Sequence, residues 1–196
     1  MRLCIYPGTF NPIHNVHLAI AEFALKHYKF DTVLFIPAYK PPHKEIDDEL
    51  ATHRYNMVKL AIEGNTQFQI SNIEYQNERF SYTYFTVLEL YKRYRPEGKI
   101  NILIGTDAFR EIDSWKFADD LKKHAHFIVF PRTKDFHEKN FQRFTEWHYD
   151  YEFAPMDFID LSSTVLRSRV YKGKNNNGVV PDKVLEYIKE NGLYQD

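Results

Sequence analysis

The chain of 196 residues has a single cysteine, Cys4, which excludes an intramolecular disulfide. It has no apolar run as long as a membrane-spanning helix, and the run in the opening segment MRLCIYPGTF is too short for a signal peptide. It also has no excess of one charge, since 26 Lys and Arg oppose 27 Asp and Glu. We therefore expect a cytoplasmic protein that binds neither nucleic acid nor a membrane and that recognises anions locally.

A chain of this length with 43% hydrophobic and 16% aromatic residues can bury a sizeable core. We expect one domain, residues 1–196, because no repeat and no linker interrupts the sequence. Its C-terminal part, residues 162–196, is expected to be helical.

Short β-rich runs alternate with longer helical patterns. The expected strands are Arg2–Tyr6, Thr32–Pro37, Phe68–Tyr75, Lys99–Gly105 and His126–Pro131, and the helical patterns between them are His17–Tyr28, His53–Gly64 and Thr83–Tyr94. Nearly continuous apolar runs are typical of strands buried on both faces. The alternation predicts an α/β, Rossmann-like fold: a mostly parallel sheet with helices on both faces and ligands at the carboxyl ends of its strands.

The C-terminal third is less regular. Arg132–Phe153 mixes charges and aromatics without a clean period, and we expect a surface excursion there. Ile159–Gly173 is expected to hold a serine and threonine N-cap and a helix that ends near Gly173. A last helix is expected to start at Pro181 and to end just before Gly192.

The segment YPGTFNPIHNVHL, Tyr6 to Leu18, carries the first functional signal. A strand that ends at Pro7-Gly8-Thr9 and enters a helix near Asn15 presents unpaired N–H groups and the positive end of a helix dipole, which favours an anion. His14 and His17 share a helix face and could stabilise charge on a phosphoryl group. Two other readings stay open: a half-built metal site, or a helix cap with an ordinary surface histidine.

GTFNPIHNVH resembles the GxFDPxHxGH signature of the HxGH nucleotidyltransferases. Four more stretches resemble one branch, the bacterial nicotinate-nucleotide adenylyltransferases: PAYKPPHK, SYTYFT, LIGTDAFREIDSW and LSSTVLR. The resemblance implies in-line attack of the 5′-phosphate of nicotinate mononucleotide on the α-phosphorus of ATP, which yields nicotinate adenine dinucleotide and pyrophosphate. It also implies Mg²⁺, held mainly by phosphates and water, and no enzyme nucleophile.

On the ATP side the resemblance implies ten binding residues, of which His14, His17 and Arg167 are catalytic. They are Gly8, Thr9, Phe10, His14, His17, Gly105, Asp107, Ser163, Thr164 and Arg167. The Gly8–Phe10 amides would hold phosphate oxygens, Ser163, Thr164 and Arg167 would make a second phosphate grip, and Asp107 would accept from ribose hydroxyls. From the residues alone, Asp107 could also be the N-cap of a helix, a role compatible with binding ribose. For Ser163 and Thr164, the residues alone favour a helix cap beside a surface arginine.

On the acceptor side the resemblance implies Lys44, Thr83, Trp115 and Lys116. Trp115 would stack on the nicotinate ring, and backbone amides near Thr83 and Lys116 would receive its carboxylate and so distinguish the acid from the amide. Lys44 would meet a phosphate. From the residues alone, a lone tryptophan in a helical pattern is more often a core residue, and Lys44 is a solvated lysine in a loop bounded by prolines.

Four positions depart from the family pattern. Pro7 stands in place of a glycine, Asn11 in place of the usual aspartate, and Phe85 in place of the aspartate of SYTxDT. Val16 replaces the glycine of HxGH, and we expect its branched side chain to press on the adenine or to reshape its pocket.

Three alternative functions remain open at this point. One is a sibling adenylyltransferase for nicotinamide mononucleotide or another phosphorylated acceptor. Another is a nucleotide-binding homologue without catalysis, as Val16 and Phe85 would suggest. The third is a metal hydrolase built on His14, His17 and His43.

Overall fold

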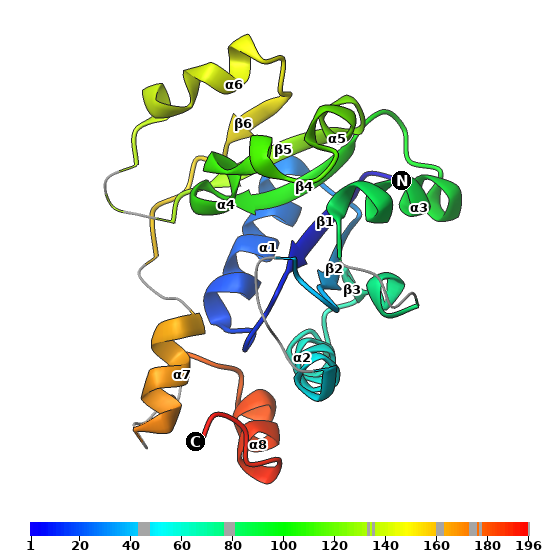
Figure 1. The fold of residues 1–196 in the computed structure, drawn as a ribbon. Helices are drawn as coiled ribbons and strands as arrows, with labels where there is room; N and C mark the ends of the chain where they lie inside the picture. The colour runs from blue at the N-terminus through cyan, green and yellow to red at the C-terminus, as the bar shows by residue number, and fades with distance from the viewer. Residues whose placement is uncertain are drawn as a thin grey trace.

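The computed structural model describes residues 1–42, 48–76, 81–132, 134, 136–159, 163–172, 176 and 178–195. Its centre is a six-stranded sheet in the order β3-β2-β1-β4-β5-β6, in which every neighbouring pair is parallel (Figure 1). The strands are β1 (Leu3–Gly8), β2 (Thr32–Pro37), β3 (Phe68–Ile70), β4 (Ile100–Gly105), β5 (Ala125–Phe130) and β6 (Tyr151–Phe153). The order reverses between β1 and β4, so a crevice is expected at their carboxyl ends.

Helices cover both faces of this sheet, as the sequence predicts. Successive residues of β1 point to opposite faces: Cys4 and Tyr6 join one buried cluster, and Leu3 and Ile5 join the other. The first cluster is completed by α1 (Asn15–Tyr28), α2 (Asp48–Ala61), α7 (Ser163–Tyr171) and α8 (Asp182–Glu190). The second is completed by α3 (Thr83–Tyr94), α4 (Thr106–Arg110), α5 (Ala118–His124) and α6 (Gln142–Glu146).

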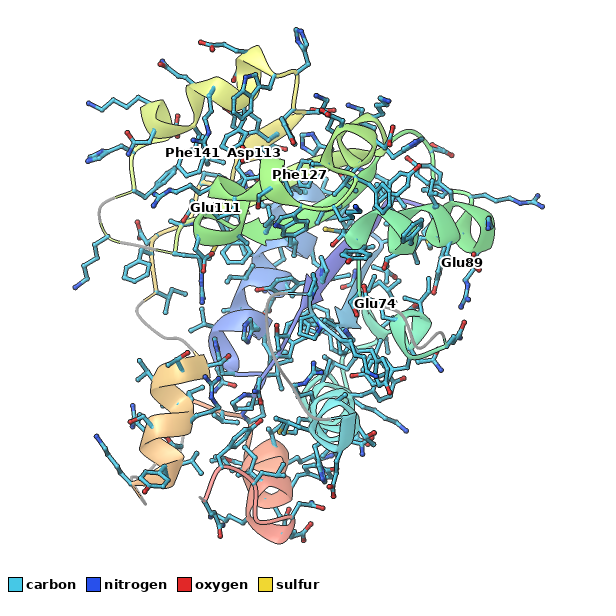
Figure 2. All side chains as sticks on the ribbon, in the orientation of Figure 1. Glu74, Glu89, Glu111, Asp113, Phe127 and Phe141 are labelled. Atoms are coloured by element: carbon cyan, nitrogen blue, oxygen red, sulfur yellow. The ribbon has the colours of Figure 1, made fainter. Side chains whose placement is uncertain are left out.

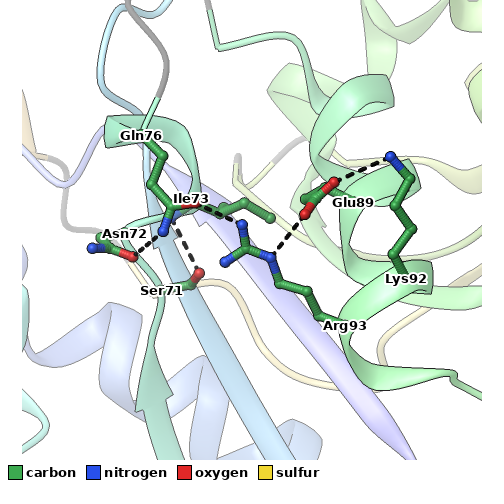
Figure 3. Close-up of polar contacts among 7 residues, drawn as sticks. All are labelled: Ser71, Asn72, Ile73, Gln76, Glu89, Lys92 and Arg93. Carbon is green, nitrogen blue, oxygen red and sulfur yellow. Dashed lines mark hydrogen bonds and ion pairs between the residues drawn. The ribbon is translucent and has the colours of Figure 1, made fainter.

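The third strand is shorter than predicted. It ends at Ile70, and Ile73–Tyr75 forms a 3₁₀ helix, η1, because the Ser71 hydroxyl accepts from the Ile73 amide and turns the chain out of the sheet. Figure 3 shows how η1 is held against α3: Arg93 donates to Gln76 at 2.6 Å and to Glu89 at 3.0 Å. Together these contacts hold the segment that follows β3 against the C-terminal half of α3.

The expectation of a surface excursion over Arg132–Phe153 is wrong. This region holds a 3₁₀ helix, η3 (Glu138–Phe141), then α6, then β6, which pairs in parallel with β5. The rings of Phe141, labelled in Figure 2, and of Phe144 are fully buried. Elements of three to five residues are too short to show a helical or strand period, so the sequence pattern did not predict them.

The two C-terminal helices start where predicted, α7 at Ser163 and α8 directly after Pro181. Gly192 follows the end of α8 with a positive φ of 59°. The predicted end of the earlier helix at Gly173 lies outside the described residues. Within the described ranges, every helix falls short of the length and apolarity needed to cross a membrane.

Candidate functional site

A cavity of about 1120 Å³ lies at the carboxyl ends of β1 and β4 and reaches the first turns of α3 and α7. Twelve of the residues predicted for the site line it: Gly8, Thr9, Phe10, His17, Thr83, Gly105, Asp107, Trp115, Lys116, Ser163, Thr164 and Arg167. His14 does not line the cavity and lies behind His17. Lys44 and His43 lie outside the described residues. The structure thus brings together segments from almost the whole length of the chain.

Gly8 and Phe10 shape the loop that follows β1. A Cβ atom on Gly8 would come within 2.9 Å of Cζ of Phe10, so glycine is needed here to make room for the aromatic ring. Phe10 has a positive φ of 47° and its side chain is only 3% exposed. Burial of this ring stabilises an otherwise unfavourable backbone conformation and fixes the course of the loop.

Arg54 of α2 ties this loop to the end of β2. Its Nη1 donates to the carbonyl oxygens of Thr9 at 2.8 Å and Ala38 at 2.6 Å, and its Nη2 donates to that of Tyr39 at 3.0 Å. The side chain is fully buried, so these charge-assisted hydrogen bonds replace its hydration. Arg54 therefore holds two walls of the cavity together without lining it.

His14 and His17 form a neutral pair at the start of α1. Burial and the Arg132 guanidinium lower the pKa of His14 to about 3, and burial, His14 and Arg132 lower that of His17 well below its ordinary value. The His14 amide donates to Nδ1 of His17 at 3.2 Å. Because Nδ1 accepts, the neutral His17 ring carries its proton on Nε2. His17 can thus offer an N–H donor at the cavity wall.

Gly105, Asp107 and Arg132 meet where β4 and β5 end. The Arg132 Nε atom lies 3.7 Å from an Asp107 oxygen, and the Arg132 amide donates to the hydroxyl of Thr106 at 3.0 Å. A Cβ atom on Gly105 would come within 2.5 Å of both side chains, so glycine is needed for this close approach. Gly105 is the N-cap of α4 and Asp107 lies in its first turn, which corrects the reading of Asp107 as the cap.

The first turn of α7 docks on the loop after β1. The Ser163 hydroxyl donates to the Pro12 carbonyl at 3.0 Å, and Arg167 Nη1 donates to the Asn11 carbonyl at 2.7 Å. Arg167 Nη2 also donates to the Thr164 hydroxyl at 3.3 Å. These contacts place a guanidinium beside a helix N-terminus, an arrangement that suits a phosphate group.

The other end of the cavity is formed by Thr83, the first residue of α3, and by Trp115 and Lys116. Trp115 is half-buried against the core cluster, so the core and stacking readings of this residue are compatible. Glu74, labelled in Figure 2, lines the cavity below α3 and accepts from the Thr86 hydroxyl at 2.7 Å. Burial raises the pKa of its carboxyl group.

Aromatic rings connect α3 to the turn that carries Trp115 and Lys116. Phe85 and Phe117 meet edge to face with centroids 5.0 Å apart, and Tyr82 and Tyr84 also contact Phe117. Phe85 is 42% exposed and Phe117 37% exposed. The aromatic ring at position 85 therefore packs on the segment opposite, in a place where an aspartate could not.

The structure corrects the expectation about Val16. Its side chain is 7% exposed, belongs to the core cluster with Ile20 and Ala21, and does not line the cavity. The Val16 side chain, at helix position N2, can turn inward even though the next residue, His17, lines the cavity, because successive helical residues differ by 100°.

The sequence reasoning missed Arg132 and Arg54. Arg132 follows the predicted strand His126–Pro131 directly, at the edge of the sheet where ligands are expected, so its position was a usable signal. Arg54 shares α2 with the buried Ala51 and Met57, and a charged residue on such a face needs a specific partner.

Comparisons with known proteins show the family of the chain. A model of the cytidylyltransferase-like family matches residues 5–169. A probable nicotinate-nucleotide adenylyltransferase of Clostridium tetani is 38% identical over 99% of both chains, and one of Clostridium botulinum strain Okra is 36% identical over 97% of this chain and 98% of the relative.

Solved structures share the fold. The nicotinic acid mononucleotide adenylyltransferase of Plasmodium falciparum, complexed with NaAD, superposes with a TM-score of 0.79 at 18% identity and covers 98% of this chain and 96% of that chain. A Vibrio parahaemolyticus structure described as a putative nicotinate-nucleotide adenylyltransferase gives a TM-score of 0.66 at 20% identity, over 99% and 95% of the two chains.

Proposed function

The chain belongs to the cytidylyltransferase-like family and, within it, to the nicotinate-nucleotide adenylyltransferases, and we propose that it transfers the AMP moiety of ATP to nicotinate mononucleotide. The products are nicotinate adenine dinucleotide and pyrophosphate, and the reaction belongs to NAD biosynthesis. We expect the protein to act in the cytoplasm, as one domain spanning residues 1–196.

One observation carries this proposal: a single cavity joins the residues of the phosphate motifs to those of the acceptor motif. Its volume of about 1120 Å³ exceeds the 300–1,000 Å³ typical of small-ligand pockets, which leaves room for two nucleotides side by side. Its lining includes Gly8 and Arg167 of the phosphate motifs and Thr83 and Trp115 of the acceptor motifs.

The ATP end is assigned to the loop after β1, the end of β4 and the start of α7. Backbone amides of Gly8, Thr9 and Phe10 bind phosphate oxygens, and Ser163, Thr164 and Arg167 bind a second set. Asp107, which follows Gly105, accepts hydrogen bonds from the ribose hydroxyls.

The reaction needs no nucleophile from the protein. The 5′-phosphate of the acceptor attacks the α-phosphorus, the bond to the bridging oxygen of pyrophosphate breaks, and pyrophosphate leaves with that electron pair. His17 donates a hydrogen bond from Nε2 to the charge that develops, His14 holds the ring of His17 from behind, and Arg167 neutralises the phosphates. Neutral imidazoles suit this role, because a donor of hydrogen bonds is needed rather than a base.

The acceptor end is assigned to Thr83, Trp115, Lys116 and Lys44. Trp115 stacks on the pyridine ring, and the amides at Thr83 and Lys116 receive its carboxylate. Thr83 opens a helix of 12 residues, so the positive end of the dipole of α3 adds to the preference for the acid over the amide.

A divalent cation accompanies ATP in nucleotidyltransferases, and we propose Mg²⁺. The cavity offers Asp107, Glu74 and Glu111 as carboxylates, yet the described residues bring no three His, Cys, Asp or Glu side chains together as a ready-made metal site. A few separate carboxylates fit a hard cation that takes most of its ligands from phosphate oxygens and water. Such an ion would neutralise charge on the leaving pyrophosphate.

The test is pyrophosphate release from ATP and Mg²⁺ with nicotinate mononucleotide and nicotinamide mononucleotide compared in parallel. We expect release to favour the acid strongly. A preference for the amide would instead identify a sibling adenylyltransferase, and ATP binding without release on either acceptor would identify a homologue that has lost catalysis.

A further inference from the structure

The last residues of the chain reach the wall of the ATP site. After α8 the backbone turns back through Gly192, with a φ of 59°, and Tyr194, with a φ of 62°. The Leu193 amide donates to the Ile188 carbonyl at 3.0 Å and closes this turn. Leu193 and Tyr194 pack against the core cluster that contains Val184 and Ile188 of α8. The turn is therefore anchored, and its direction is fixed by packing.

Tyr194 makes one specific contact with the loop after β1. Its hydroxyl donates to Oδ1 of Asn11, with 2.5 Å between the oxygens, across 183 residues of sequence. Burial raises the pKa of Tyr194 well above its ordinary value, although Arg167 and Arg54 lower it, so the hydroxyl keeps its proton and remains a donor. A hydrogen bond in a partly buried place restricts the Asn11 side chain.

Asn11 also contacts Arg167. Its backbone carbonyl accepts from Arg167 Nη1 at 2.7 Å, and Asn11 and Arg167 both line the cavity. Tyr194 itself does not line the cavity. Asn11 is therefore held at two points: its side chain contacts the C-terminal turn, and its backbone carbonyl contacts α7.

We propose that Tyr194 is a positioning residue for catalysis, because through Asn11 it fixes the guanidinium of Arg167 where the ATP phosphates bind. This inference rests on the proposed function, in which Arg167 binds phosphate. It makes the C-terminal turn a part of the active site, although the turn touches no substrate.

The experiment compares two Tyr→Phe variants, each of which lacks one phenolic hydroxyl group. Tyr194→Phe removes the hydroxyl that contacts Asn11. Tyr187→Phe is the matched control: the Tyr187 hydroxyl contacts His53 at 2.9 Å and Asn56 at 3.0 Å, joins α8 to α2, and lies outside the cavity wall. Affinity for ATP is measured by calorimetry without acceptor, and the KM for each substrate is measured from pyrophosphate release.

We expect Tyr194→Phe to weaken ATP binding by about five- to tenfold, the range for loss of one hydrogen bond, and to leave the KM for the acceptor within about twofold. Tyr187→Phe should leave ATP affinity within about twofold. If both variants bind ATP as the wild type does, the proposal is wrong.

A double-mutant cycle separates positioning from general structure. If Tyr194 acts through Arg167, Tyr194→Phe should change ATP affinity by less than about twofold in an Arg167→Lys background. Full additivity of the two effects would overturn the proposal. Should the wild type bind ATP but release no pyrophosphate with nicotinate mononucleotide, the proposed function fails, while the comparison of ATP affinities still decides the role of Tyr194.

Discussion

The imidazole ring of His14 stacks on that of His17, with the centroids 3.7 Å apart and 28° between the ring planes. Two imidazolium ions at this distance would repel each other strongly, and both rings are in addition withdrawn from water. The pair is therefore neutral at pH 7, and His17 serves as a hydrogen-bond donor whose orientation His14 sets.

We expect His17→Ala to lower kcat by about 10²- to 10³-fold, the cost of removing one donor to a developing charge. Pyrophosphate release measures the effect, and circular dichroism checks the fold. His27→Ala is the control, since His27 lies on the same helix and is exposed. A His17 variant as fast as the His27 variant would remove His17 from the mechanism.

The depressed pKa values predict a loss of stability in acid. Below pH 6.5 the unfolded chain protonates both histidines, whereas the folded protein keeps His14 neutral until about pH 3. The unfolded state binds more protons across this interval, so the free energy of unfolding falls as the pH falls from 6.5 towards 3.

Urea titrations between pH 7.5 and 4.5 measure this slope. His14→Asn keeps an N-cap residue that does not titrate, and it should flatten the dependence on pH. Equal slopes for His14→Asn and the wild type would contradict the assignment.

Much of the fold could be predicted because the strands of a parallel sheet are buried on both faces. Thr32–Pro37 and Thr83–Tyr94 were predicted with the observed bounds, since an apolar run and a helical period mark them clearly. The region from Arg132 to Phe153 was not, because its buried rings lie on elements of three to five residues. In so short an element, a core aromatic looks the same as a surface one.

Only the site residues that lie in recognisable sequence motifs could be predicted. Gly8, His17 and Arg167 came from the resemblance, and the cavity brings them together. Tyr194 belongs to no motif, and its contact with Asn11 depends on how the chain turns after α8. Such a contact is a property of the tertiary structure and leaves no local pattern in the sequence.

Phe85→Ala should raise the KM for nicotinate mononucleotide severalfold and leave the KM for ATP within about twofold. The ring of Phe85 packs on Phe117 and thereby connects the two segments assigned to the nicotinate carboxylate. Trp147→Ala is the matched control, because Trp147 is 43% exposed and lies outside the cavity wall. Equal KM values for Phe85→Ala and the wild type would show that the ring contact is dispensable.

Gly105→Ala should raise the KM for ATP by about tenfold. Its new Cβ would lie 2.5 Å from both Arg132 Cγ and Asp107 Oδ1, so both side chains must move away from the end of β4. Asn101→Ala tests whether the effect is local, because Asn101 lies on the same strand and bonds to the Leu3 carbonyl away from the cavity. That variant should change stability and leave the KM for ATP unchanged.

Val16→Gly restores the family residue, yet we expect it to destabilise the protein rather than to improve ATP binding. Val16 is buried in the core, so its loss leaves a void, and glycine adds a helix penalty. Together these effects lower the free energy of unfolding by about 2–3 kcal/mol. Ala19→Gly on the exposed face of α1 isolates the helix penalty, about 1 kcal/mol. Suppose that Val16→Gly lowers the free energy of unfolding no more than Ala19→Gly does, and that it tightens ATP binding. The valine side chain then contacts the nucleotide, and its place in the core cluster does not describe the state that binds ATP.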